Sequence, residues 1–248
     1  MLETYNHFRA SSSDRAAMRS RYGVSDNTVL YFPCDEAYQT QILDVSDARL
    51  RFVTDVNNTV AFSATAGAQS LSISVIGTIP TEGAVPTLSA TRSFLVWLHS
   101  IPTATLGQSR FMINTIAGDA GVTIPGVVLS PTLRDGTTTV SAPAYTAAVT
   151  GQAEFRAVFV DRTLGNAYSL QSTNGVAVVQ RGTFTALGAL GDIVSDYNKI
   201  YGPHTTAKDT YGFGASYLPD GTDIAGALVL AEALRVASTT TKVLPTGM

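Results

Sequence analysis

Strict alternation of apolar and polar residues predicts β-structure. Leu71, Ile73 and Val75 alternate with Ser72 and Ser74, as a strand with one buried face requires. Short runs rich in β-branched and aromatic residues predict further strands at 29–32, 50–53, 59–62, 93–99, 110–115, 127–130, 154–161, 167–171, 176–180 and 211–217. So many short strands in one chain indicate two packed sheets.

Two runs, 94–98 and 155–160, are apolar on both faces. We expect them to be central strands covered on both faces. Residues 137–151 show little pattern, so two interpretations of this segment stay open: a long loop or a short edge strand. Turn residues separate several of the predicted strands, at 134–136, 173–175 and 218–221.

The amino-terminal segment differs from the rest of the chain. Residues 11–14 offer several N-cap side chains, 15–22 contain good helix formers, and Gly23 can end a helix. We therefore expect an arm with a short helix over residues 1–23 and one β-sandwich domain over 24–248.

Four segments occur in the order found in concanavalin A-like and laminin-G-like jelly-roll domains. They are VLYFPCDEA with LDVS (29–37, 43–46), SFLVWL (93–98), FRAVFVD with AYSL and TNGV (155–161, 167–170, 173–176), and YGFGA with GTDIAGALVLAEAL (211–215, 221–234). The chain from about residue 27 to 238 resembles this family, which includes many lectins and glycan-binding modules. The resemblance implies an all-β, two-sheet antiparallel jelly-roll sandwich whose last strand ends in a short helical turn.

The last of these segments departs from the family pattern. Ala225 and Gly226 replace an acidic pair, and Leu228 and Ala231 stand where the resemblance implies charged, outward-facing residues. An outward leucine predicts that another chain or the arm covers this face, so we expect Leu228 to take part in an interaction.

Composition limits the kinds of partner. Charged residues make up 14% of the chain, against about a quarter in an average protein, and the formal net charge is −3. No basic face is indicated for nucleic acid, no apolar run is long enough to cross a membrane, and the start lacks the pattern of a Sec signal. The low charge suits a protein that is partly buried against neighbours, and the single cysteine, Cys34, allows no internal disulfide.

The arm carries four arginines against two acidic residues over positions 1–22, a net charge of about +2 on an otherwise acidic chain. Two interpretations stay open: the arm reaches a neighbouring subunit, or its helix packs on its own domain. In the first, the contact residues would be Tyr5, Phe8, Arg9, Arg15 and Arg19.

The motifs of catalysis and metal binding are missing from the sequence. Glycosidases of this architecture carry two glutamates on one strand, but Glu154 is the only glutamate on its strand. No nucleophile elbow or phosphate loop occurs. The histidines, His7, His99 and His204, are far apart, and no cofactor or metal is expected. Four acidic residues could gather around calcium, although turn capping is the commoner role: Asp35, Glu36, Asp44 and Asp47.

Aromatic residues in loops are candidates for sugar binding. Trp97 lies within an apolar run, which favours a core position. The loop 192–209 and its flank offer better candidates, namely Tyr197, Tyr201, His204 and Tyr211. A subunit contact would use the same residue types, so both interpretations stay open.

Taken together, these features favour a non-enzymatic virion structural protein of a bacteriophage. A capsid decoration protein or a tail or fibre component, made in the bacterial cytoplasm, would bind other virion proteins or copies of itself. The alternative is a lectin-like module that binds surface glycans.

Overall fold

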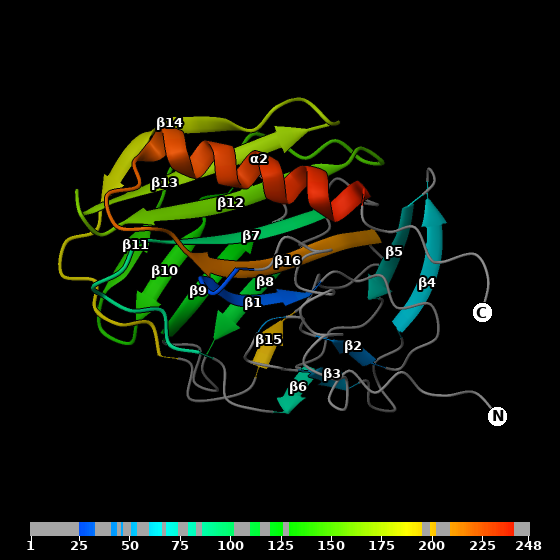
Figure 1. The fold of residues 1–248 in the computed structure, drawn as a ribbon, viewed down its shortest axis with the longest axis horizontal. Helices are drawn as coiled ribbons and strands as arrows, with labels where there is room; N and C mark the ends of the chain where they lie inside the picture. Colours follow the sequence, from blue (N-terminus) through cyan, green and yellow to red (C-terminus); the bar gives the residue numbers. More distant parts are fainter. Residues whose placement is uncertain are drawn as a thin grey trace.

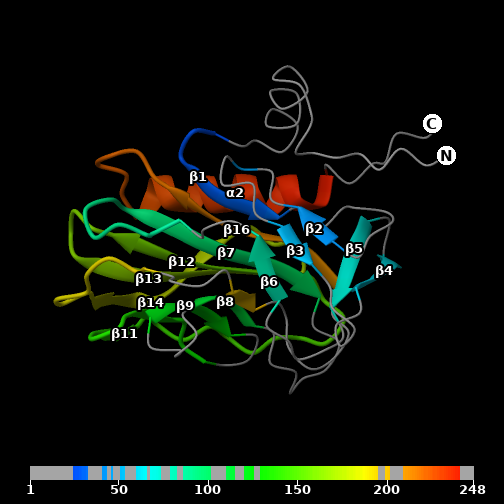
Figure 2. The same cartoon turned by 90° about the horizontal axis from the view of Figure 1, so that it is seen from below.

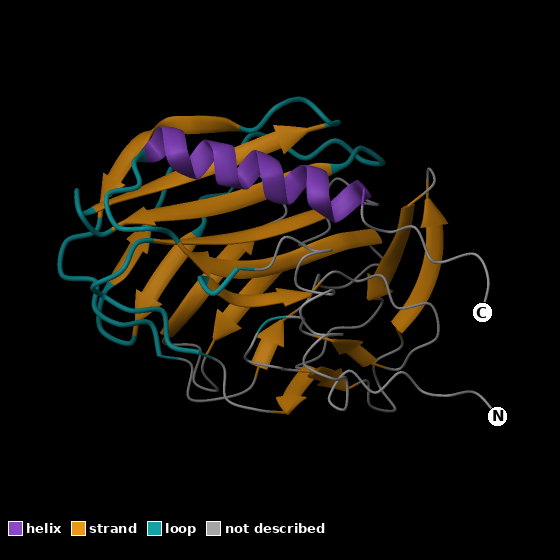
Figure 3. Ribbon diagram, in the orientation of Figure 1, coloured by secondary structure: helices purple, strands orange, loops and turns teal. Residues whose placement is uncertain are grey.

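The computed structural model describes residues 25–32, 41–43, 46, 51–53, 60–65, 68–73, 79–82, 86–101, 110–114, 120–125, 129–194, 199–201 and 209–240. Within these residues the chain forms antiparallel strands and a carboxyl-terminal helix (Figure 3). The strands are β1 Thr28–Phe32, β2 Gln41–Leu43, β3 Arg51–Val53, β4 Val60–Thr65, β5 Ala68–Ile73, β6 Ile79–Glu82, β7 Phe94–Ile101, β8 Arg110–Asn114, β9 Ala120–Pro125, β10 Thr132–Asp135, β11 Thr139–Ser141, β12 Glu154–Asp161, β13 Asn166–Thr173, β14 Val179–Ala186, β15 Lys199–Tyr201 and β16 Asp209–Tyr217. The helix is α2, Ile224–Thr240.

The strands form two eight-stranded sheets, which confirms the predicted jelly-roll sandwich. The large sheet has the order β14-β13-β12-β7-β16-β5-β4, with β1 also paired to β16 (Figure 1). The second sheet has the order β11-β10-β9-β8-β15-β6-β3-β2. Figure 2 shows the order of layers: α2 lies on one side of the large sheet, and β8, β9 and β11 lie on the other.

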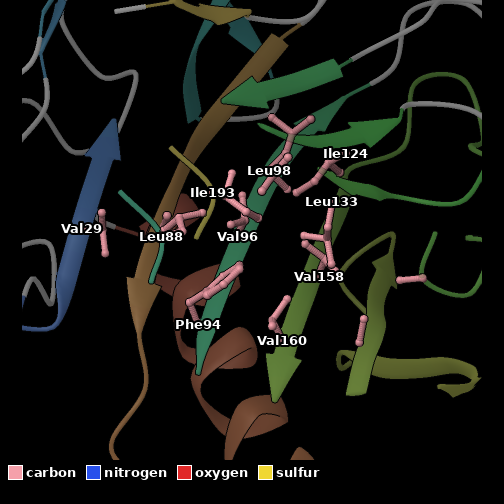
Figure 4. Close-up of a cluster of buried hydrophobic side chains, with 14 of the residues drawn as sticks. Val29, Leu88, Phe94, Val96, Leu98, Ile124, Leu133, Val158, Val160 and Ile193 are labelled. Carbon is pink, nitrogen blue, oxygen red and sulfur yellow. The ribbon is translucent and has the colours of Figure 1, made fainter. Parts of the chain in front are cut away.

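β7 and β12 are the central strands that their sequences predicted. All eight residues of each are buried. Side chains on one face, such as Val96 and Val158, meet residues of the second sheet and its loops in the main core (Figure 4). Side chains on the other face, such as Trp97 and Phe159, form a separate core under α2. Each strand therefore needs apolar residues on both of its faces.

The segment after β16 corrects the sequence analysis. The resemblance implied that residues 221–234 contain a last strand ending in a short helical turn, but Ile224–Thr240 is a helix of 17 residues. Asp223 caps it, because its Oδ1 accepts a hydrogen bond from the Gly226 amide at 2.9 Å. Ala227 and Ala231 face the sheet and are fully buried. The apolar outer face of the large sheet requires such a cover.

Smaller differences concern strand boundaries. The strand predicted at 176–180 begins only at Val179, and residues 129–130 of the strand predicted at 127–130 lie outside any strand. The segment 137–151 contains the short edge strand β11, one of the two forms expected for it. Asn174 and Gly175, at φ 53° and 76°, form the tight turn that their sequence predicted.

Candidate functional site

Most of the sequence-predicted contact residues lie outside the described part of the chain. For Tyr201 the structure describes only its place in β15. The residues outside the description are Tyr5, Phe8, Arg9, Arg15, Arg19, Tyr197 and His204, together with the calcium candidates Asp35, Glu36, Asp44 and Asp47. Their proposed roles therefore stay predictions.

Tyr211 does not fit the sugar-binding role predicted for it. It is 5% exposed in β16, and its ring lies 4.8 Å from the imidazole of His99. His99 is also buried, and its Nδ1 lies 2.6 Å from Oγ of Ser238 near the end of α2. Because the Ser238 hydroxyl donates to the Arg235 carbonyl, it can accept from His99 Nδ1. This group fastens the helix to the sheet and leaves Tyr211 no open ring face.

The sequence predicted that Leu228 points outward from a strand, and this prediction is wrong. Leu228 lies in the second turn of α2 and is partly buried against the core between the helix and the large sheet. The exposed position next to it is Val229, at 72%. The outward apolar residue is thus displaced by one position from the predicted one.

Trp97 lies in the core, as its sequence context favoured. Its indole is 1% exposed under α2, with the ring of Tyr31 at 5.2 Å and that of Phe155 at 5.7 Å. It cannot serve as a surface platform for a sugar.

An exposed aromatic ring occurs instead on the edge strand β14. Phe184 is 50% exposed and lies 6.1 Å from the ring of Tyr168 on the neighbouring strand. Tyr168 in turn stacks on Phe159, at 5.6 Å and 18° between the ring planes. The base of the exposed ring is therefore supported by two further aromatic rings that are buried in the sheet.

A β-bulge sets the position of Phe184. Ala167 pairs with Thr185 and Ser169 pairs with Arg181, so β14 has two more residues than β13 over this stretch. Gly182 makes the irregular backbone possible, with φ at 63°. Bulges on edge strands commonly redirect a side chain, and here the bulge coincides with the exposed phenylalanine.

Polar groups adjoin this ring. The Asn166 amide donates to the Tyr168 hydroxyl at 3.3 Å. The Gln180 amide donates to the carbonyls of Gly182 and Thr183. Because these two carbonyl groups of the strand are already hydrogen-bonded, a further strand is hindered from pairing there. An apolar ring beside amides and hydroxyls can stack on the apolar face of a neutral ring compound and hydrogen-bond to its rim.

The sequence contained part of this signal. The run from Val179 to Ala186 includes a glycine in a stretch of strand formers, which is typical of a bulge. Our strand prediction ended at Gln180, so Phe184 was not recognised. Its exposure depends on the partner strand and could not be read from the run itself.

A buried ion pair lies between the two sheets, at the amino end of β12. Nη2 of Arg156 lies 2.7 Å from Oε2 of Glu154, and both side chains are at most 4% exposed. Carbonyls of Pro125 and Thr146 accept from the same guanidinium, which ties β12 to β9 of the second sheet. Burial raises the pKa of Glu154, while Arg156 acts in the opposite direction. The pair therefore links the two sheets of the sandwich.

A polar network holds the loop that precedes the predicted sugar-binding loop. Oδ2 of Asp135 accepts from the Gly191 amide at 2.6 Å, and the Arg162 guanidinium donates to the carbonyls of Leu190 and Gly191. Hydrogen bonds from Gly191, Thr138 and Thr137 hold the pKa of Asp135 well below its usual range. The donors and acceptors of this network largely hydrogen-bond with one another, so the role of the network is to position the loop.

The described residues contain no group of three His, Cys, Asp or Glu side chains that could hold a metal ion. No helix among them is long and apolar enough to cross a membrane.

Comparison with known proteins defines the class of fold. No family model and no curated protein matches the sequence. Domain 4 of AbnA, a GH43 extracellular arabinanase from Geobacillus stearothermophilus, whose structure is in complex with arabinotriose, matches with a TM-score of 0.50 and 11% identity over 83% of this chain and 98% of that domain. A protein of unknown function from Shewanella oneidensis MR-1 gives 0.46 and 14% over 86% and 97%.

Peanut lectin gives a TM-score of 0.38 with 8% identity over 76% of this chain and 97% of the lectin. The match to the arabinanase domain, at 11% identity, shows a shared β-sandwich fold.

Proposed function

We propose that this protein is a non-catalytic β-sandwich that binds neutral glycans, with Phe184 as the ring on which a sugar stacks. The observation that carries the proposal is the half-exposed Phe184 on the bulge of β14, backed by Tyr168. A flat apolar ring that its neighbours hold in place offers a surface on which the apolar face of a sugar can stack.

Neutral sugars fit this surface better than acidic ones. The polar groups identified beside Phe184 are the amide of Asn166, the hydroxyl of Tyr168 and backbone carbonyls. An acidic sugar would require a cation at this place, usually an arginine, and Arg181 of the same strand is instead directed to Gln171, to which its Nε donates at 3.0 Å. The arabinanase domain shows that a sandwich of this architecture can be found in complex with a neutral oligosaccharide.

Titration of the intact protein with a panel of neutral and acidic oligosaccharides tests the proposal. We expect binding of neutral members, weakened roughly tenfold by Phe184→Ala, and retained by Phe184→Tyr. Val176→Ala is the matched control, because Val176 is 65% exposed in the turn before the same strand. Equal affinities for wild type and Phe184→Ala would refute the assigned site.

The loop residues Tyr197, Tyr201 and His204 define a competing location for the same function. Loss of binding with Tyr197→Ala or Tyr201→Ala, and not with Phe184→Ala, would place the sugar in that loop. Absence of binding to every oligosaccharide would overturn the glycan proposal itself.

A role as a virion structural protein is the second candidate. It is favoured by large apolar side chains that remain exposed in the described part of the chain, such as Leu129, Leu164 and Val176, together with the low charge of the whole chain. In this role the protein would pack against other virion proteins or copies of itself. Sedimentation over a range of concentrations, and a search for the protein in purified particles, test this role.

A further inference from the structure

We propose that the solvent-facing side of α2 is the docking site for the amino-terminal segment of the same chain, residues 1–24. This inference concerns the face of the protein covered by α2 and does not depend on the glycan site. It selects the second of the two interpretations that the sequence left open for the arm.

The outward side of α2 has the composition of a buried surface. Its exposed positions include Ala225, Val229 (72% exposed), Ala233 and Val236 (40% exposed). These residues follow the spacing of one helix face. A helix that faces water normally presents charged residues on that side. In α2 the two charged side chains, Glu232 and Arg235, are engaged with each other at 2.5 Å.

The chain enters the described structure close to the start of this helix. The Tyr217 amide donates to the Asn27 carbonyl at 2.7 Å, and Arg92 donates to the Asn27 side chain at 3.0 Å. Tyr217 is followed by a short connection to Ile224, the first residue of α2. Residues 1–24 are therefore tethered near the amino end of α2.

The segment is long enough to follow the helix. An α-helix of 17 residues is about 25 Å long, whereas 24 residues can span up to roughly 80 Å when extended. A short tether also keeps the effective concentration of the segment high. Both points favour docking within one chain over docking on a second copy.

The segment complements α2 in polarity and charge. It offers Leu2, Tyr5 and Phe8 at intervals of three residues, with Met18 and Tyr22 in the predicted short helix. Its four arginines have suitable partners, because α2 has no basic residue in its last turn to offset the negative end of the helix dipole. Asp220 and Asp223, at the amino end of α2, provide further acidic groups.

Site-specific photo-crosslinking tests the proposal in the full-length protein. The photoreactive residue p-benzoyl-phenylalanine is placed at position 229, where 72% exposure leaves the fold undisturbed. A matched control carries it at position 164, which is 64% exposed in the β12–β13 turn. Mixing ¹⁵N-labelled with unlabelled protein before irradiation distinguishes links within one chain from links between copies.

We expect peptides from residues 1–24 to be linked to the 229 region, with both peptides of a pair carrying the same isotope. The yield should be at least severalfold above that of the 164 control. Crosslinked pairs that join a labelled peptide to an unlabelled one would overturn the proposal, because they would show that the segment docks on a second copy. Links at 229 that exclude residues 1–24 would overturn the assignment of the segment altogether.

Discussion

Gly214 lies opposite Trp97 on the neighbouring strands β16 and β7, and the indole occupies the space where a side chain would otherwise project. A Cβ built on Gly214 would lie 3.2 Å from Nε1 of Trp97 and would collide with the carbonyl oxygen of Leu30 on β1. The glycine therefore lets β1 and the indole approach β16 from its two sides.

Gly214→Ala should destabilise the fold by about 1–3 kcal/mol, because the backbone of β1 has to move to make room. Gly212→Ala is the graded comparison, since its nearest contact, the Phe32 carbonyl, is at 3.1 Å, and a smaller loss is expected. Urea unfolding of the three proteins measures the difference. An unchanged midpoint for Gly214→Ala would show that this close approach is not a constraint.

Ala231→Leu should lower stability by about 1–3 kcal/mol, because the fully buried methyl group of Ala231 faces the large sheet and leaves no room for a larger side chain. Ala189→Leu makes the same chemical change at an exposed turn position and should alter stability by less than about 0.5 kcal/mol. Thermal unfolding compares the two variants. Equal effects at both positions would contradict the packing of α2.

The buried carboxyl of Glu154 should make stability depend on pH. Burial raises its pKa in the folded state above the ordinary value of 4.5, so the folded protein holds this proton more strongly than the unfolded chain does. The favourable contribution is complete below pH 4.5 and is lost as the pH rises through the folded-state pKa.

Glu154→Gln removes this titration, so the stability of wild type relative to Glu154→Gln should fall as the pH rises above 4.5. Urea unfolding of both proteins at several pH values gives the difference directly. The opposite slope would mean that attraction to Arg156, at 2.7 Å, outweighs the cost of burying the charge.

Asp135→Asn should destabilise the protein by about 1 kcal/mol at neutral pH, because the amide accepts the hydrogen bonds of Gly191, Thr137 and Thr138 less well than the carboxylate does. The folded-state pKa of Asp135 is lowered, so its contribution is present above the ordinary value of 3.8 and is lost as the pH falls below it.

The difference between wild type and Asp135→Asn should therefore shrink on acidification, as measured by thermal unfolding at decreasing pH. A constant difference across this range would show that the carboxylate charge is not what holds the loop.

The sequence by itself determined the class of fold. Runs that are apolar on both faces identified β7 and β12 as central strands, because a strand covered on both sides has no solvent-facing row of polar residues. Asn174 and Gly175 specified their turn, since both adopt positive φ at low cost. These features depend on residues close together in the chain and can be read locally.

Only the tertiary structure decided what covers the outer face of the large sheet and which aromatic rings stay exposed. The residues of α2 suit a helix, but its place over Trp97 depends on strands distant in sequence. Tyr211 is buried and Phe184 exposed because of their neighbours: His99 and the end of α2 for Tyr211, and an edge position with a bulge for Phe184. Exposure is a property of the assembled sheet, so residue type and spacing could not fix the candidate site.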